Sequence, residues 1–275
     1  MKIFQKKIFY HYCFIFQTFF YACDILPTTC IAIGGKKFTD VWKGFFPVLK
    51  KRALNKRAGT TRAAALGAMA DIMKAAATDG TGEQLACAHA GELIPIYMEC
   101  MSQNIKENNV RNNAVYGLGL LVSLGINSCG AQISNILDQL WQVMQREKAD
   151  NVKDQVLGAV ARICIAIEAC ENVNLPIQPV LQGLVQGLPV KQDPSELAPV
   201  VTCLEKYLNH LNDSQIVIIL KNCAVMSQEY GAAFDDMVKI AVTRLMKKLQ
   251  EGGKSGAFDS LSADQKSAIQ EVLIN

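Results

Sequence analysis

The side chains that could perform chemistry are few, and their spacing does not suit a reaction. The sequence has three histidines, His11, His89 and His210, and none stands at metal-ligand spacing from a cysteine or carboxylate on one helical face. Ten cysteines are present, but none forms a CxxC pair. Those after residue 80 lie in apolar helical segments, which is typical of small buried side chains in a reducing compartment. We therefore expect no metal site and no cofactor.

The motifs of common enzymes are missing as well. The sequence contains no GxxxxGK[ST] phosphate loop, no HExxH pair and no GxSxG nucleophile elbow. Gly117 and Gly119 lie within a helical pattern, where close packing explains them better than a nucleotide does. The carboxylates of Asp235 and Asp236 stand at a predicted helix start, where the helix dipole favours them. Because an active site needs converging titratable groups, we expect no catalytic residue and no small-molecule substrate.

Charged residues recur by position instead. Arg62, Arg111 and Lys153 each follow the residue that begins an apolar stripe, with 49 residues from the first to the second and 42 from the second to the third. Helices must position these charges, because the stripe residues recur at steps of four, four, three and four, which places them on one helical face. The stripes are Thr61, Ala65, Met69, Ile72 and Ala76; Val110, Ala114, Leu118, Leu121 and Gly125; and Val152, Val156, Val160, Ile163 and Ile167.

Two details support the view that these helices are copies of one another. Each carries a small residue seven positions after its stripe begins, namely Ala68, Gly117 and Ala159, which lets a neighbouring helix come close. Each is also preceded by a residue that can cap a helix: Thr60, Asn109 and Asn151.

A second helix is expected before each copy, at 38–54, 85–103 and 131–146. In the first of them, Val41, Trp42, Phe45, Val48 and Leu49 are expected on the inner side. Further helices are predicted at 176–188, 197–211, 215–228 and 234–250, and a last one opened by Ser262-Ala-Asp-Gln265. A period of 40 to 50 residues with two helices per unit is typical of HEAT or armadillo arrays. With strand signals nearly absent, we predict an all-α fold, an α-α superhelix (HEAT/armadillo-like solenoid) of about five helical hairpins over residues 36–275.

Residues 1–35 form a separate, hydrophobic and aromatic-rich segment, which we expect not to belong to the fold. Nine of the aromatic residues lie between Phe4 and Tyr21, and lysines precede them. This composition leaves three interpretations open: a translated upstream segment or gene-prediction artefact, a real hydrophobic tail, or a secretion signal. The scattered helical cysteines favour the last least.

Charge is unevenly distributed along the chain. Residues 1–62 carry twelve Lys or Arg against two Asp, whereas residues 63–275 carry sixteen against twenty-three Asp or Glu. The acidic body favours basic protein partners. The cluster Lys50-Lys-Arg-Ala-Leu-Asn-Lys-Arg57 is either a solvated turn, with cations at a helix carboxyl end, or a contact for RNA phosphates or a localisation signal.

One stretch resembles a known family. Asn109-Val-Arg-Asn-Asn-Ala-Val-Tyr-Gly-Leu-Gly-Leu-Leu121 is similar to a segment in the carboxy-terminal repeats of the importin-β (karyopherin-β) family, and Arg146-Glu-Lys-Ala-Asp-Asn-Val-Lys-Asp154 is similar to the segment that follows it there. The similarity continues through Leu188-Pro-Val-Lys-Gln-Asp193 and ends with Phe258-Asp-Ser-Leu-Ser-Ala-Asp-Gln265. It covers roughly residues 38–275.

The resemblance implies a nuclear import receptor that shuttles between cytoplasm and nucleus. It implies basic cargo proteins, such as ribosomal proteins or histones, on the concave side of a superhelix, and nucleoporin phenylalanine-glycine (FG) segments on the outer side. Ran-GTP binding is implied only for amino-terminal repeats that have no counterpart in this sequence.

Two roles remain open for the recurring polar residues, which are Arg62, Arg111, Asn112, Lys153, Asp154 and Arg162. They form either a ladder between adjacent inner helices, for example from Arg111 to Asp154, or a direct contact with cargo. Likewise, the chain is either the carboxy-terminal part of an import receptor or a HEAT scaffold for protein interaction without a transport role.

Overall fold

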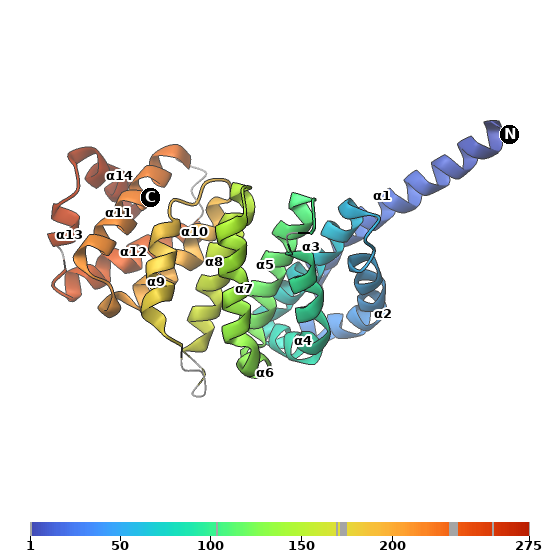
Figure 1. Ribbon diagram of the computed structural model, residues 1–275, viewed down its shortest axis with the longest axis horizontal. Helices are drawn as coiled ribbons and strands as arrows, with labels where there is room; N and C mark the ends of the chain where they lie inside the picture. Colours follow the sequence, from blue (N-terminus) through green and yellow to red (C-terminus); the bar gives the residue numbers. More distant parts are fainter. Residues whose placement is uncertain are drawn as a thin grey trace. The chain divides into compact units, whose positions relative to one another are not determined.

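The structure is a computed structural model that describes the backbone of residues 2–102, 104–168, 170, 175–230, 236–254 and 256–274, and the side chains among them from residue 17 to residue 273. The described residues form helices and no β-strand, which confirms the predicted all-α class. The chain divides into two compact units: unit 1, Met1–Ile133, and unit 2, Ser134–Asn275. Within each unit, successive helices pack against one another as in a HEAT-like solenoid (Figure 1).

Unit 1 is built around its third helix. Its elements are α1 (Lys2–Ile33), α2 (Gly35–Ala53), α3 (Gly59–Ala76), η1 (Ala77–Asp79), α4 (Thr81–Cys100), α5 (Asn108–Leu124), α6 (Ile126–Cys129) and η2 (Gly130–Gln132). Helix α3 packs against α1, α2, α4 and α5. Every residue of the predicted stripes in α3 and α5 is buried, so the period of these two helices was predicted correctly.

Small residues allow the helices of unit 1 to approach closely. A methyl group added at Gly117 would lie 2.3 Å from the Tyr97 ring of α4, so the ring occupies the space that a side chain would need. The hydroxyl group of Tyr97 donates a hydrogen bond to the backbone oxygen of Leu66 at 3.2 Å, which ties α4 to α3. The interpretation of Gly117 as a packing residue is confirmed.

Helix α2 buries a different face from the one predicted. Trp42 and Leu49 are buried as expected, but Phe45 is 40% exposed and Val48 is 47% exposed, while Phe46 takes an inward position. Apolar residues occupy adjacent positions in this segment, so periodicity alone did not determine which of the two phenylalanines points inward.

The packed part of unit 1 begins earlier than the domain boundary expected at residue 36. Cys23, Leu26 and Cys30 of α1 are buried, and the helix packs against α3. The side chains of residues 1–16, including His11 and Cys13, lie outside the described residues. Among the residues that the structure describes, no single helix is long and apolar enough to cross a membrane, although Asn108–Leu124 and Ile126–Arg146 pass the same test as a bent pair.

Unit 2 is also built of packed helices. Its elements are α7 (Ile133–Arg146), α8 (Asp150–Ile167), α9 (Ile177–Gly187), η3 (Pro194–Glu196), α10 (Leu197–Lys206), η4 (Leu208–His210), α11 (Asp213–Tyr230), α12 (Asp236–Glu251), α13 (Gly256–Asp259) and α14 (Ala263–Ile274). Helix α10 packs against α8 and α12, and α11 packs against α14. The stripe predicted in α8 is buried throughout.

Helix caps were predicted with mixed success. The backbone amide of Gln265 binds the hydroxyl of Ser262 at 3.3 Å, and the amide of Ser262 binds Oε1 of Gln265 at 3.1 Å, so the capping box of α14 is confirmed. The caps predicted at Thr60, Asn109 and Asn151 are wrong. These three helices start two residues earlier, after Ala58, Glu107 and Ala149, and no side chain caps them.

Candidate protein-interaction site

Arg62 lies inside unit 1 and links three helices. Its side chain on α3 is only 4% exposed, and its Nε donates to the backbone oxygen of Ala53 at 2.8 Å, where α2 ends. Its guanidinium also lies 3.9 Å from a carboxylate oxygen of Glu99 on α4. This arginine therefore provides a hydrogen-bond donor for a free carbonyl group at the end of α2, and it does not face solvent.

Three further candidates are half-buried. Arg111 donates to the backbone oxygen of Ile105 at 2.5 Å and to Oδ1 of Asn108 at 2.6 Å, which fixes the start of α5. The amide nitrogen of Asn112 lies 3.3 Å from Oδ1 of the next asparagine. Lys153 lies on α8 in unit 2. The pairing of Arg111 with Asp154 would join the two units and stays a prediction.

Unit 1 does contain rungs between its inner helices, made by residues that sequence reasoning missed. The amide of Asn113 donates to the backbone oxygen of Ala63 at 2.8 Å, and the hydroxyl of Tyr116 donates to Oδ1 of Asp71 at 2.9 Å. Both bonds run from α5 to α3. Burial raises the pKa of Asp71, while the bond from Tyr116 acts in the opposite direction. Uncharged polar residues such as Asn113 and Tyr116 do not recur at a fixed spacing in the sequence, so their bonds between helices are found only in the structure.

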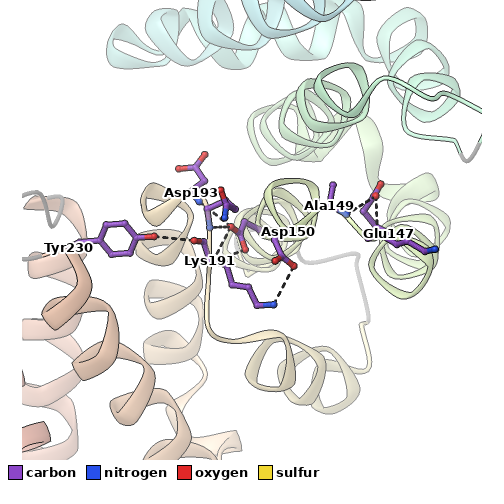
Figure 2. Close-up of polar contacts among 9 residues, drawn as sticks. Glu147, Ala149, Asp150, Lys191, Asp193 and Tyr230 are labelled. Atoms are coloured by element: carbon purple, nitrogen blue, oxygen red, sulfur yellow. Dashed lines mark hydrogen bonds and ion pairs between the residues drawn. The ribbon is translucent and has the colours of Figure 1, made fainter.

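In unit 2, Asp154 holds a loop onto α8. Its carboxylate is buried and accepts the backbone amides of Lys191 at 3.1 Å, Gln192 at 2.6 Å and Asp193 at 3.0 Å. Figure 2 shows that Lys191 is at the centre of this contact, since its ammonium also reaches Asp150 at 3.3 Å. Burial raises the pKa of Asp154, and the three amides lower it.

A second helix also binds this loop, and a local bond precedes α8. The hydroxyl of Tyr230 on α11 donates to the backbone oxygen of Lys191 at 3.1 Å (Figure 2). Just before α8, the carboxylate of Glu147 accepts the backbone amide of Ala149 at 3.0 Å. The loop is thus attached to two helices of unit 2, α8 through Asp154 and α11 through Tyr230.

Arg162 forms a buried ion pair on the same helix. Its guanidinium donates to the Glu196 carboxylate at 2.8 Å, and the side chain of Glu196 is only 2% exposed. Gly158 leaves room for this pair, because a methyl group there would lie 1.4 Å from Oε2 of Glu196. Asp193 caps the helix that follows, because its carboxylate accepts the amide of Ser195 at 3.2 Å.

The side chain of Gln155 adds a third rung between α8 and the segment before α10. Its amide donates to Oδ2 of Asp193 at 2.8 Å. Asp154, Gln155 and Arg162 therefore share one function in the structure, which is to fix the Leu188–Glu196 segment against α8. Of the six predicted site residues, the structure brings Asp154 and Arg162 together in this network.

The basic cluster 50–57 is partly neutralised within unit 1. Lys50 pairs with Glu92 of α4, and Lys56 pairs with Glu99 at 2.6 Å. Lys50, Lys51 and Arg52 lie in the last turn of α2, where cations interact favourably with the helix dipole. These contacts favour the interpretation of the cluster as a helix end, and RNA binding by it stays a hypothesis.

An apolar depression on unit 2 offers space for a partner. This α7–α9 groove has a volume of about 710 Å³. Its apolar walls include Leu137, Trp141 and Met144 of α7 and Val180 of α9. Trp141 reaches across to α9, because a methyl group at Gly183 would lie 2.5 Å from its ring. An aromatic side chain at the edge of an open groove can receive an apolar side chain of a second protein.

Among the residues that the structure describes, no group of three or more His, Cys, Asp or Glu side chains could hold a metal ion. In these polar clusters, three backbone amides bind the carboxylate of Asp154, and the guanidinium of Arg162 pairs with the carboxylate of Glu196. Their geometry stabilises the packing of the helices in unit 2, and the α7–α9 groove is an open depression on the same unit.

Comparison with known proteins gives this array a context. No protein-family model matches the chain. Human Importin-4 is 24% identical over 258 residues, which is 92% of this chain and 23% of the relative. Mouse Importin-4 is 27% identical over 260 residues, with the same shares covered. The chain is similar to importins. The probable importin subunit beta-4 of Schizosaccharomyces pombe is 27% identical over 180 residues, covering 65% of this chain and 16% of the relative.

The similarity confirms the resemblance to the importin-β family read from the Asn109–Leu121 segment. The chain spans less than a quarter of the length of these importins. What the importins bind or carry as whole proteins therefore enters only as a proposal for this chain.

Proposed function

We propose that this chain is the carboxy-terminal part of a nuclear import receptor, which binds protein cargo and shuttles between cytoplasm and nucleus. The observation that carries the proposal is the similarity to importins over 92% of the chain. The all-helical repeats support it, because such arrays bury their core between neighbours and leave extended surfaces for other proteins.

Nucleoporin FG segments are the proposed ligands of the α7–α9 groove. Its volume of about 710 Å³ and its apolar walls suit a phenylalanine side chain next to Trp141. Aromatic pairs add about 0.5–1.5 kcal/mol beyond the burial of apolar area. Such a contact is weak and reversible, as repeated passage through a pore requires.

Basic cargo, of the ribosomal-protein or histone type, is the proposed partner of the acidic body. Residues 63–275 carry twenty-three acidic against sixteen basic side chains, so long-range attraction would steer a positively charged segment toward it. For the six polar residues Arg62, Arg111, Asn112, Lys153, Asp154 and Arg162 we favour the ladder role over direct cargo contact. The contacts of Arg62, Asp154 and Arg162 within their own units support a structural role over direct cargo contact.

The test is a binding measurement on the full chain with two labelled peptides, a neutral Gly-Leu-Phe-Gly repeat and a lysine-rich histone-like peptide. We expect Trp141→Ala to weaken the phenylalanine peptide at least tenfold, because an aromatic anchor in a groove carries much of the binding energy. The matched control is Phe45→Ala, which removes an exposed aromatic side chain from unit 1 and should leave affinity unchanged.

The lysine-rich peptide should bind in low salt and dissociate as salt is raised. Absence of binding to both peptides in low salt would refute the transport role, and a HEAT scaffold without a transport role would then be the better description. Circular dichroism of each variant shows whether the helical array is intact.

A further inference from the structure

A row of three glutamines runs along the exposed side of α9. Gln178, Gln182 and Gln186 stand four residues apart, and all three are exposed. We call these residues the glutamine ladder. In an α-helix, this spacing places successive side chains on one face at intervals of about 6 Å. Three identical amides at this spacing are not explained by the packing of α9, whose buried residues are Val180, Leu181, Leu184 and Val185.

The ladder stands between two grooves. Gln182 and Gln186 line the α7–α9 groove, and all three glutamines line a second groove between α9 and α11, of about 490 Å³. The opposite wall of this α9–α11 groove includes Ser214, Gln215 and Ile218. No Asp, Glu, Lys or Arg side chain belongs to its described lining.

The ladder has hydrogen-bonding capacity to spare. Gln178 uses its amide nitrogen on the backbone oxygen of His210, at 2.9 Å. Within the described part of the chain, no hydrogen bond occupies the amides of Gln182 and Gln186. Each amide offers two donors and an acceptor, which is the complement of a peptide group with its N–H and C=O.

The spacing of the ladder matches an extended polypeptide. An extended chain rises about 3.3 Å per residue, so alternate peptide groups, which face the same side, recur about every 6.6 Å. Over the two steps of the ladder, the mismatch with a helical spacing of about 6 Å amounts to roughly 1 Å, which flexible glutamine side chains can absorb. Alternate peptide groups of a strand laid along α9 therefore meet successive glutamines.

We propose that the glutamine ladder binds the backbone of an extended, uncharged polypeptide segment, which lies along α9 and places an aromatic side chain in the α7–α9 groove. The inference rests on the proposed function, because it adds the backbone contact to the phenylalanine contact at Trp141. Recognition through peptide groups does not depend on the residues between the phenylalanines, and it does not depend on salt. The ladder thus binds extended segments through their backbone.

The experiment measures binding of a neutral Gly-Leu-Phe-Gly repeat peptide to the full chain by fluorescence anisotropy. Gln182→Met with Gln186→Met keeps the length and helix propensity of both side chains but removes their amides. We expect about tenfold weaker binding, since the variant loses two uncharged hydrogen bonds. The matched control is Gln142→Met, an exposed position of α7 that lines neither groove. Unchanged urea midpoints will show that both variants remain folded.

In a second peptide, the backbone amides that flank the phenylalanine are N-methylated. The effect of this methylation on affinity would not depend on the glutamines if they only stabilised the fold. Methylation should weaken binding to the parent chain but should have little further effect on the double variant, because the amides it addresses are gone. Equal affinity of parent and double variant, or an equal effect of methylation on both, would overturn the ladder. If Trp141→Ala abolishes binding while the double variant binds normally, the ladder fails and the phenylalanine site stands. If the parent chain does not bind the peptide, both fail.

Discussion

Removing the carboxylate of Asp154 should destabilise unit 2 because three backbone amides depend on it. Asp154→Ala deprives Lys191, Gln192 and Asp193 of the acceptor that they share at 2.6–3.1 Å. Asp154→Asn keeps one oxygen acceptor, loses the charge, and places an NH₂ group where the second oxygen stood. The two substitutions thus separate the number of acceptors from their charge.

The magnitude follows from the exposure of the loop. A buried amide left without a partner costs about 1–3 kcal/mol, so three would cost about 3–9 kcal/mol if water could not reach them. Lys191 and Gln192 are exposed, so water will reach their amides once the loop relaxes. Removing a buried carboxylate also recovers its cost of desolvation. We therefore expect losses near the lower bound, about 3 kcal/mol for alanine and about half of that for asparagine.

The assay combines urea unfolding of the full chain with hydrogen exchange of the amides in the Leu188–Asp193 loop. Asp150→Asn is the control, because the Asp150 carboxylate pairs with the exposed ammonium of Lys191 at 3.3 Å, and such a pair is worth less than about 1 kcal/mol. Protection of the loop amides should fall in Asp154→Ala and persist in the control. A loss of stability no larger than that of Asp150→Asn, with the loop amides still protected, would refute the reasoning.

Three other perturbations test the remaining contacts. Gly158→Ala should destabilise unit 2 by about 3 kcal/mol, because its methyl group must displace the buried Glu196 carboxylate from its arginine. Arg62→Met should cost about 2 kcal/mol through the unpaired oxygen at the end of α2, with no loss of peptide affinity in the folded protein. Burial lowers the pKa of His89 from 6.5, and its Nε2 accepts a hydrogen bond from the indole N–H of Trp42 at 3.0 Å. The folded protein therefore favours the neutral imidazole. Its contribution to the stability of unit 1 should be complete above pH 6.5 and be lost as pH falls through the lowered pKa.

Each of these measurements has a control variant in the same chain. Gly91→Ala meets no atom within 4 Å, so it should leave stability unchanged or raise it, and a similar result for Gly158→Ala would contradict the crowding at Glu196. For His89, thermal unfolding from about pH 7.5 to about pH 5 is compared with His89→Gln, which should flatten the pH dependence. Glu92 raises and Lys50 lowers the pKa of His89, so a steeper acid loss in Glu92→Gln is also expected. A weaker peptide affinity in folded Arg62→Met would favour direct cargo contact.

The inner helices could be predicted from sequence because their stripes follow a strict period, and all three are buried. Other features depend on choices between equivalent neighbours. Phe45 and Phe46 are both apolar, and only the packing against neighbouring helices selects the second. Glu196 can serve a helix cap or an arginine, and the space above Gly158 decides for the arginine. The rungs of Asn113 and Gln155 are uncharged and have no counterpart in the periodic pattern.

The packing of an aromatic ring against a glycine has a consequence for chimaeras between this chain and related proteins. Tyr97 rests against Gly117, and Trp141 rests against Gly183, in each case from one helix to another. Replacing the glycine alone would cause a steric clash, and replacing the aromatic residue alone would leave a cavity. The two residues of each pair must therefore be substituted together. A chimaera that exchanges a helical hairpin should remain stable only when both residues of a pair come from the same parent. Junctions therefore belong outside the segments Tyr97–Gly117 and Trp141–Gly183.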